Sequence, residues 1–134
     1  MLGLLYVTDA AVQVMKEQGS GHLVNTSSVA GRKSGPLRGA YPGTKFAVNA
    51  ISEAPRQELI EDNVRVTVVG PGAVETELPD HTTDEEAREG IQIVYGLDTI
   101  LQPEDIANAR AYCVVQPKRV SVSEVLIRPT QQGN

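Results

Sequence analysis

The sequence has one cysteine, no long apolar run and no basic run, and each absence narrows the classes of function. Cys113 has no partner for an internal disulfide among the 134 residues. We therefore expect a cytoplasmic protein in which this side chain is a small buried residue. No stretch of 18 or more apolar residues occurs, so we expect no membrane-spanning helix. Twelve basic and seventeen acidic side chains give a net charge of −5, which disfavours nucleic acid and anionic membranes as partners.

Motifs of other enzyme classes are missing as well. The chain has no Gly-x-Ser-x-Gly turn and no His-Glu-x-x-His helix, which disfavours a serine hydrolase or a zinc protease. His22 and His81 have no metal-ligand spacing with Asp, Glu or Cys, so we expect no metal site and expect both rings to face solvent. The first 15 residues lack a basic start and a small-residue cleavage pattern. They predict a helix and not a targeting segment.

Short β-branched segments alternate with helical segments along the chain. The apolar spacing, glycines and prolines predict strands over 22–28, 64–70 and 122–129, and helices over 2–17, 40–62, 82–92 and 102–116. This alternation implies parallel strands in one α/β sheet with helices over both faces. Because such sheets usually have about four to six strands, we expect residues 1–134 to form a single partial domain. The remainder is expected on the N-terminal side of a longer protein.

Three side chains near the start of the second predicted helix suit proton transfer. Tyr41 and Lys45 stand four residues apart, which places them on one helix face, about 5–6 Å apart at Cβ. A nearby ammonium favours the phenolate and lowers the tyrosine pKa from its usual value of about 10. Ser28 ends the preceding strand, at the carboxyl edge where open α/β sheets bind ligands. The trio suits interconversion of an alcohol and a carbonyl. Taken alone, however, such a pair is more often a solvated helix face.

The surrounding segment, residues 22–59, resembles the short-chain dehydrogenase/reductase family. In that family a strand ends in Asn-x-Ser-Ser, and its second serine is catalytic. A Tyr-x-x-x-Lys pair follows thirteen positions later, as "NTSS" and "YPGTK" do here. The segments 68–78, 101–109 and 123–132 look like the family's Pro-Gly motif, last helix and last strand. The resemblance implies the C-terminal half of a Rossmann-type, doubly wound parallel sheet, without the N-terminal dinucleotide-binding half.

The resemblance also implies a role for each matching residue. Ser28 would orient the substrate and stabilise its oxygen, and Tyr41 would be the acid or base. Lys45 would lower the Tyr41 pKa and bind the nicotinamide ribose. The nicotinamide end of the cofactor would be held by Tyr41, Lys45, Pro71, Gly72, Val74 and Thr76. The ending "IRPTQQ", residues 127–132, resembles a bacterial subgroup that acts on hydroxy acids and small aldehydes. We therefore expect a small alcohol or carbonyl substrate and NADP(H) rather than NAD(H).

The sequence departs from the family pattern at the cofactor site. It lacks the glycine-rich turn that approaches the pyrophosphate, and the family's catalytic asparagine would fall just before Met1. We therefore expect the C-terminal half of a reductase, which by itself binds no cofactor detectably. The alternative is a truncated, inactive fragment that docks on a complete reductase.

Individual residues near the site carry further expectations. Asn25 is interpreted as structural, closing a backbone hydrogen bond beside the serine pair. Pro42 biases Tyr41 away from helical dihedral angles, although a proline is tolerated in a first turn. Pro55 predicts a kink near Ala54. The family pairs helices 2–17 and 40–62 with a second copy, so we expect a homo-oligomer, whose interface this kink puts in question. Substrate choice would reside mainly in residues 77–101.

Overall fold

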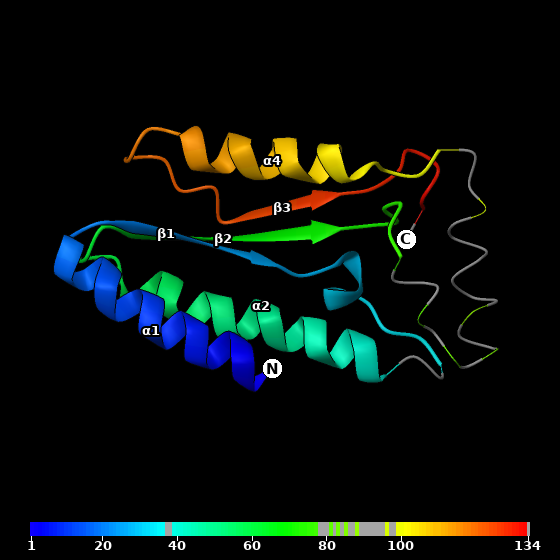
Figure 1. The fold of residues 1–134 in the computed structure, drawn as a ribbon, viewed down its shortest axis with the longest axis horizontal. Coiled ribbons are helices and arrows are strands. Elements are labelled where there is room, and N and C mark those ends of the chain that lie inside the picture. The colour runs from blue at the N-terminus through cyan, green and yellow to red at the C-terminus, as the bar shows by residue number, and fades with distance from the viewer. Residues whose placement is uncertain are drawn as a thin grey trace.

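The computed structural model describes residues 1–36, 39–77, 81, 83, 85, 88, 96 and 99–133. Its elements follow one another along the chain as helix, strand, short 3-10 turn, helix, strand, helix and strand (Figure 1). They are α1 (Leu2–Gln18), β1 (Gly21–Thr26), η1 (Val29–Gly31), α2 (Ala40–Glu58), β2 (Val64–Pro71), α4 (Pro103–Val115) and β3 (Glu124–Ile127). The three strands and three of the helices predicted from the sequence are confirmed. The helix expected over 82–92 and the 77–101 specificity stretch fall largely outside the described residues.

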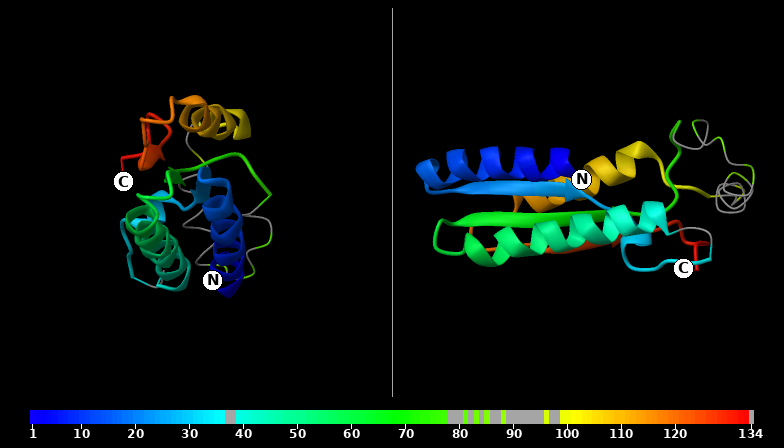
Figure 2. Two further views of the ribbon diagram at one scale, coloured as in Figure 1. Left: turned by 90° about the vertical axis from the view of Figure 1, so that its left-hand side faces the viewer. Right: turned by 90° about the horizontal axis from the view of Figure 1, so that it is seen from below.

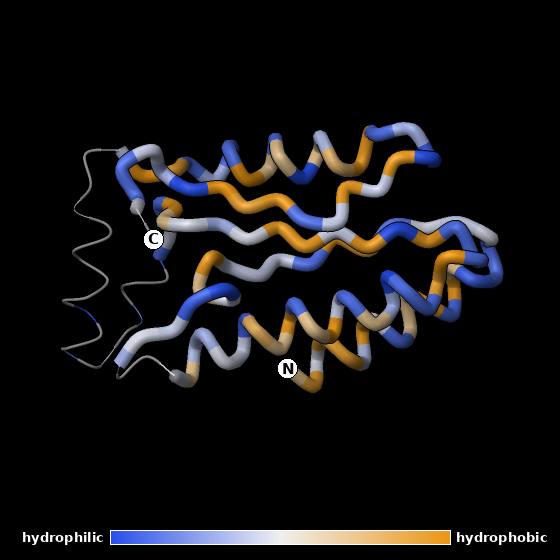
Figure 3. Tube along the Cα trace, turned by 180° about the vertical axis from the view of Figure 1, so that it is seen from behind, coloured by the Kyte–Doolittle hydropathy of each residue, from blue (hydrophilic) through white to orange (hydrophobic). Residues whose placement is uncertain are grey.

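The three strands form one parallel sheet in the order β1-β2-β3. Leu23 pairs with Val66 across the first ladder, and Val68 pairs with Glu124 across the second. The nearly continuous β-branched run of β2 is buried over most of its length, because this strand is central and covered on both faces. Figure 3 shows apolar stretches along the strands and mixed apolar and polar residues along the helices. The predicted parallel α/β architecture is confirmed.

Helices cover the two faces of the sheet unequally. Asn25 of β1 bonds to Ser52 of α2, whereas its neighbour Thr26 receives a hydrogen bond from Arg110 of α4. Since successive strand residues point to opposite faces, α2 and α4 lie on opposite sides of the sheet, with α1 beside α2 (Figure 2). The strand order continues in one direction, so the two crossovers differ in hand. The β1–α2–β2 crossover is right-handed and the β2–α4–β3 crossover is left-handed, an arrangement found in about 2% of such units.

Local chemistry sets the ends of α1 and α2. Gly19 ends α1 in the left-handed region, with φ of 64°, and its amide bonds back to the last turn. The α2 helix ends at Glu58, four residues before the predicted end at 62, so that predicted boundary is wrong. Pro55 lies inside α2 and is buried, and the helix continues beyond it for one turn. The kink near Ala54 stays a prediction.

Side chains close both ends of α4. At the start, Gln102 and Asp105 form a capping box, and Pro103 occupies the first turn. At the other end, the Arg65 guanidinium donates to the carbonyl oxygens of Val114, Gln116 and Val120. Arg65 therefore ties β2 to the end of α4 and to the connection that leads to β3.

His22 is not solvent-facing, contrary to the sequence-based expectation. The ring is half-buried between β1 and β2, and its Nε2 lies 2.7 Å from Thr67 Oγ1. That hydroxyl donates to the Val122 carbonyl at 2.6 Å, so Nε2 carries the ring proton and donates. Burial and the nearby Arg65 cation lower the His22 pKa. His81 is exposed and Cys113 is fully buried, as expected.

The described residues contain neither a membrane-spanning helix nor a cluster of metal ligands. None of their helices combines the length and apolarity needed to cross a bilayer. Within the same part of the chain, no three His, Cys, Asp or Glu side chains gather in a way that could hold a metal ion.

Candidate active site

Ser28 lies two residues beyond the carboxyl end of β1, which ends at Thr26 and not at Ser28, so the predicted strand boundary is wrong. Its backbone is extended, with φ of −166° and ψ of 161°, and it caps the short η1 turn. The Ser28 hydroxyl accepts a hydrogen bond from the Ala30 amide at 3.1 Å and donates to the Pro71 carbonyl at 3.3 Å. Ser28 therefore connects the carboxyl ends of two adjacent parallel strands, the edge where open α/β sheets bind ligands.

Tyr41 and Lys45 lie on one face at the start of α2. Tyr41 is the second residue of the helix and remains helical although Pro42 follows it. The first amides of a helix have no partner within it, so a proline there removes no hydrogen bond. The Lys45 amine lies over the Tyr41 ring, 5.6 Å from its centroid, within the range of a cation–π contact. The tyrosine side chain is about half exposed, at 48%, and therefore accessible to a ligand.

The Lys45 amine also reaches the end of β1. It donates to the Thr26 carbonyl at 3.4 Å, two residues before Ser28. Partial burial lowers the Lys45 pKa. One cation therefore lies between the phenol ring of α2 and the strand end that leads to the serine.

The segment that follows β2 is held from the C-terminal side of the chain. The Gly72 amide donates to the Ile127 carbonyl at 2.7 Å, and the Ala73 amide donates to Gln132 Oε1 at 3.0 Å. A Cβ on Gly72 would require the end of the flexible Gln132 side chain to move, which would cost its hydrogen bond to Ala73. Val74 is buried and pairs with Leu101, whereas the Thr76 side chain is exposed.

Four of the sequence-predicted residues make two direct contacts in the structure. Ser28 contacts Pro71 directly, and Tyr41 contacts Lys45. Gly72 continues the chain from Pro71. The Val74 side chain is buried, so it packs behind this segment.

Asn25 is structural, as expected, but its partner is not backbone. Its side-chain amide donates to the Ser52 hydroxyl of α2 at 2.9 Å, and that hydroxyl donates to the Val48 carbonyl. The expected backbone hydrogen bond is therefore wrong. Asn25 fastens β1 to the helix that carries Tyr41 and Lys45.

Sequence reasoning missed three residues beside the site: Ser27, Gly31 and Asn49. The Ser27 hydroxyl donates to the Lys45 carbonyl at 3.2 Å, and the Asn49 amide donates to the Gly31 carbonyl at 2.9 Å. Gly31, three positions after the serine pair, is the available sequence signal for a close approach. The two hydrogen bonds join residues 18 positions apart in the sequence, so local spacing does not predict them.

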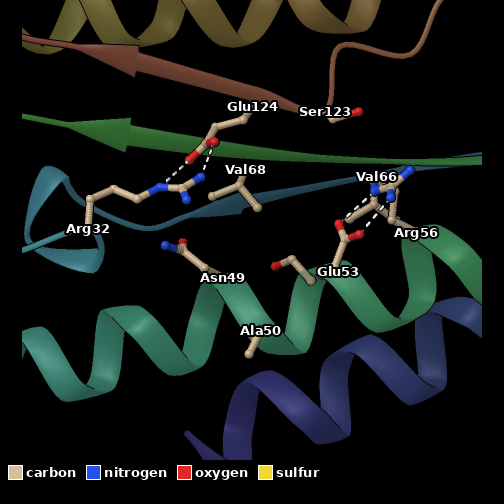
Figure 4. A pocket seen from close by; sticks show the side chains of 10 residues that line it. Arg32, Asn49, Ala50, Glu53, Arg56, Val66, Val68, Ser123 and Glu124 are labelled. Atoms are coloured by element: carbon tan, nitrogen blue, oxygen red, sulfur yellow. Dashed lines mark hydrogen bonds and ion pairs between the residues drawn. The ribbon is translucent and has the colours of Figure 1, made fainter.

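A groove of about 350 Å³ lies on another part of the molecule, between α2 and strands β2 and β3 (Figure 4). It opens there because α4 covers the opposite face of these strands. Ion pairs flank it, Arg32 with Glu124 and Arg56 with Glu53. Ser28, Tyr41 and Lys45 do not line it. Its lining residues are Arg32, Asn49, Ala50, Ser52, Glu53, Arg56, Val66, Val68, Ser123 and Glu124.

Comparisons with known proteins agree with this geometry. An uncharacterized oxidoreductase of Staphylococcus saprophyticus is 42% identical over 133 residues, covering 98% of this chain and 53% of that protein. The closed form of serine dehydrogenase in complex with NADP+ superimposes with a TM-score of 0.84 at 30% identity, covering 98% of this chain and 53% of that one. For 4-hydroxyisoleucine dehydrogenase with NADH and succinate, the TM-score is 0.76 at 26% identity, with 95% of this chain and 53% of that one covered.

The chain thus spans about half the length of the relatives that it matches. The family model described as short chain dehydrogenase matches residues 1–87, a segment that contains α1, the serine pair and the Tyr-x-x-x-Lys pair. The chain belongs to the short-chain dehydrogenase family, whose members are NAD(P)-dependent oxidoreductases.

Proposed function

We propose that this chain is the catalytic half of a cytoplasmic oxidoreductase that interconverts an alcohol and a carbonyl with NAD(P)(H). Ser28, Tyr41 and Lys45 form its catalytic group. The observation that carries the proposal is the position of the Lys45 amine, which lies over the Tyr41 ring and donates to the strand end next to the serine pair.

The reaction follows from what each side chain can donate. When a carbonyl is reduced, the Tyr41 hydroxyl gives its proton to the substrate oxygen, and it takes the proton back in the oxidative direction. The Lys45 ammonium stabilises the negative charge that develops on Tyr41 as the proton leaves. The Ser28 hydroxyl turns from the Pro71 carbonyl to the same substrate oxygen and stabilises it. A bound nicotinamide cofactor supplies or accepts the hydride.

The donor set fits the nicotinamide end of such a cofactor. Tyr41 and Thr76 present hydroxyls, and Lys45 presents an amine, which suit the hydroxyls of a ribose and a carboxamide. Pro71, Gly72 and Val74 complete the contact, with Val74 as a support behind the loop. NADP(H) is proposed as the preferred cofactor because the resembling bacterial subgroup commonly uses it, and because the serine dehydrogenase structure contains NADP+.

We propose a small hydroxy acid or alcohol as the substrate. Two of the solved structures that this chain resembles are named as dehydrogenases of serine and 4-hydroxyisoleucine, which are both hydroxy amino acids. The proposal also includes a homo-oligomer. The helices α1 and α2 lie side by side on one face and expose large apolar side chains, among them Leu5, Tyr6 and Phe46.

A full-length hybrid tests the activity. It joins the N-terminal half of the Staphylococcus saprophyticus relative to residues 1–134, and NADPH formation is followed with a panel of hydroxy acids and small alcohols. Tyr41→Phe should lower turnover by about 10²–10⁴-fold, because the proton donor is lost. Cofactor affinity, measured by fluorescence titration, should stay nearly unchanged, because Lys45, Thr76 and the segment after β2 keep the other proposed contacts.

The control is Tyr112→Phe, which removes an exposed hydroxyl from α4, on the opposite face of the sheet. It should leave turnover intact. Full activity in the Tyr41→Phe hybrid would remove Tyr41 from the mechanism. The 134-residue chain alone should bind no NADPH detectably, and tight binding would contradict that expectation.

The coverage of about half of each relative also favours a second candidate, an inactive fragment that docks on a complete reductase. The DNA upstream of Met1 separates the two. An in-frame extension that encodes a strand followed by a glycine-rich turn favours the enzyme, and a stop codon immediately upstream favours the docking fragment.

A further inference from the structure

The η1 turn that carries Ser28 is fastened to α2 on both sides of the serine. On one side, the Ser27 hydroxyl donates to the Lys45 carbonyl at 3.2 Å. On the other side, the Asn49 amide donates to the Gly31 carbonyl at 2.9 Å. Lys45 and Asn49 are one helical turn apart, so the two bonds lie on one face of α2.

Gly31 packs against this helix with no free space. A Cβ at this position would lie 2.8 Å from both Asn49 Nδ2 and Ser27 Oγ, and 3.0 Å from the Lys45 carbonyl oxygen. The backbone of the turn at Gly31 therefore lies against α2 with no room for a side chain between them. Any side chain on residue 31 would push the turn away from α2 and break at least one of the two bonds.

The Asn49 side chain is placed for geometry rather than for stability. Its amide orientation is fixed, because only the NH₂ group can donate to the Gly31 carbonyl. This leaves Asn49 Oδ1 buried without a hydrogen-bond partner, which is unfavourable. In Figure 4 the amide nitrogen points toward the turn, away from the centre of the groove. An apolar side chain of similar size would avoid the unpaired oxygen but would release the turn.

We propose that Asn49 is a positioning residue that sets the separation between Ser28 on the turn and Tyr41 and Lys45 on the helix. The inference rests on the proposed function. When the Ser28 hydroxyl turns to a substrate, its bond to the Pro71 carbonyl is lost. The Asn49–Gly31 bond then keeps the serine backbone in register with α2 during proton transfer.

The full-length hybrid tests this role with Asn49→Ala and Gly31→Ala. Gln57→Ala is the matched control, because it removes an exposed amide from the same helix that bonds to an exposed glutamate and not to the turn. Both test variants should lower kcat about 10–100-fold, since a displacement of about 1 Å in a catalytic group has effects of this size. The KM for NADP+ should stay within twofold, and Gln57→Ala should match the parent. A kcat that stays at the parent value while only the thermal midpoint falls would overturn the inference.

Hydrogen exchange on the 134-residue chain gives a readout that needs no activity. The Ala30 and Gly31 amides bond to Ser28, through its hydroxyl and its carbonyl. In Asn49→Ala they should exchange at least tenfold faster, with the β2 amides unchanged, and unchanged exchange at both positions would also overturn the inference. A parent hybrid that folds and binds NADPH but turns over no substrate contradicts the proposed function instead. The exchange result then decides whether Asn49 holds the turn.

Discussion

A single side chain, Lys45, connects the two parts of the proposed site. Its amine lies over the Tyr41 ring and donates to the Thr26 carbonyl, while its backbone carbonyl accepts the Ser27 hydroxyl. Partial burial lowers the Lys45 pKa, because removing water disfavours the charged amine. The Thr26 carbonyl and the Tyr41 ring stabilise the charged amine and so offset part of this desolvation cost.

His22 makes the stability of the protein depend on pH. Burial and the Arg65 cation lower its folded-state pKa below the unfolded value of 6.5. Between these two values the unfolded chain binds more protons, so the free energy of unfolding rises with pH across this window. Stability should therefore be full above about pH 7 and fall as the pH drops through 6.5 toward the folded pKa.

Urea denaturation between pH 5 and pH 8 measures this effect. His22→Gln removes the titrating ring and should flatten the dependence on pH. His81→Gln, at an exposed histidine, should leave it unchanged. An equal slope in the parent and in His22→Gln would show that other groups control the stability in this range.

At the residue level, the sequence was informative where the contact is local. Tyr41 and Lys45 share a face because four residues make about one helical turn, and this spacing can be read directly. The bonds of Asn49 and Ser27 were not predictable, because they depend on how the turn after β1 lies against a helix 18 residues away. His22 was misjudged because its partner Thr67 is 45 residues distant.

Among the elements, α4 has its C-terminal end closed by Arg65 and by Gln116, whose side-chain amide donates to the Tyr112 carbonyl at 2.9 Å. The last carbonyls of a helix have no partner within it, and α4 has no glycine after it to form a left-handed cap. Arg65 of β2 takes this role and donates to Val114, Gln116 and Val120. The same guanidinium thus orders the helix end and the connection to β3.

Arg65→Ala should lower the free energy of unfolding by about 1–3 kcal/mol, the range for losing charge-assisted hydrogen bonds to carbonyls. Arg65→Lys should fall between the parent and the alanine variant, because an ammonium cannot span three carbonyls as a planar guanidinium does. Urea denaturation provides the measurement. The control is Arg119→Ala, at an exposed residue of the same connection, and an equal loss in that variant would refute the capping role.

The order of the elements could be predicted, but the hand of the second crossover could not. Apolar periodicity, Pro103 and the Gly19 end locate the helices, and the β-branched run locates β2. Nothing local specifies on which face α4 returns, and the general preference for right-handed crossovers gives the wrong answer here. The groove between α2 and β3 lies on the face that α4 leaves uncovered, so it could not be predicted from the sequence either.

On the scale of the whole molecule, α1 is a helix that contributes no buried side chain to the core. Met15, packed over Gly21, is a contact that ties this helix of 17 residues to β1. It leaves large apolar residues exposed, namely Met1, Leu2, Leu5, Tyr6, Val7 and Val14. Exposed apolar side chains in this number favour burial against another protein surface.

A second copy that packs on the α1–α2 face would bury this surface, and stable interfaces remove about 800 Å² per partner. Sedimentation equilibrium of the 134-residue chain should therefore give a dimer. Phe46→Glu places a charge on the exposed apolar surface of α2 and should give a monomer. Val115→Glu is the matched control, because Val115 is equally apolar and more exposed but lies on α4, across the sheet. A parent that sediments as a monomer would contradict the predicted dimer. A dimeric parent that only Val115→Glu dissociates would place the interface on α4 instead.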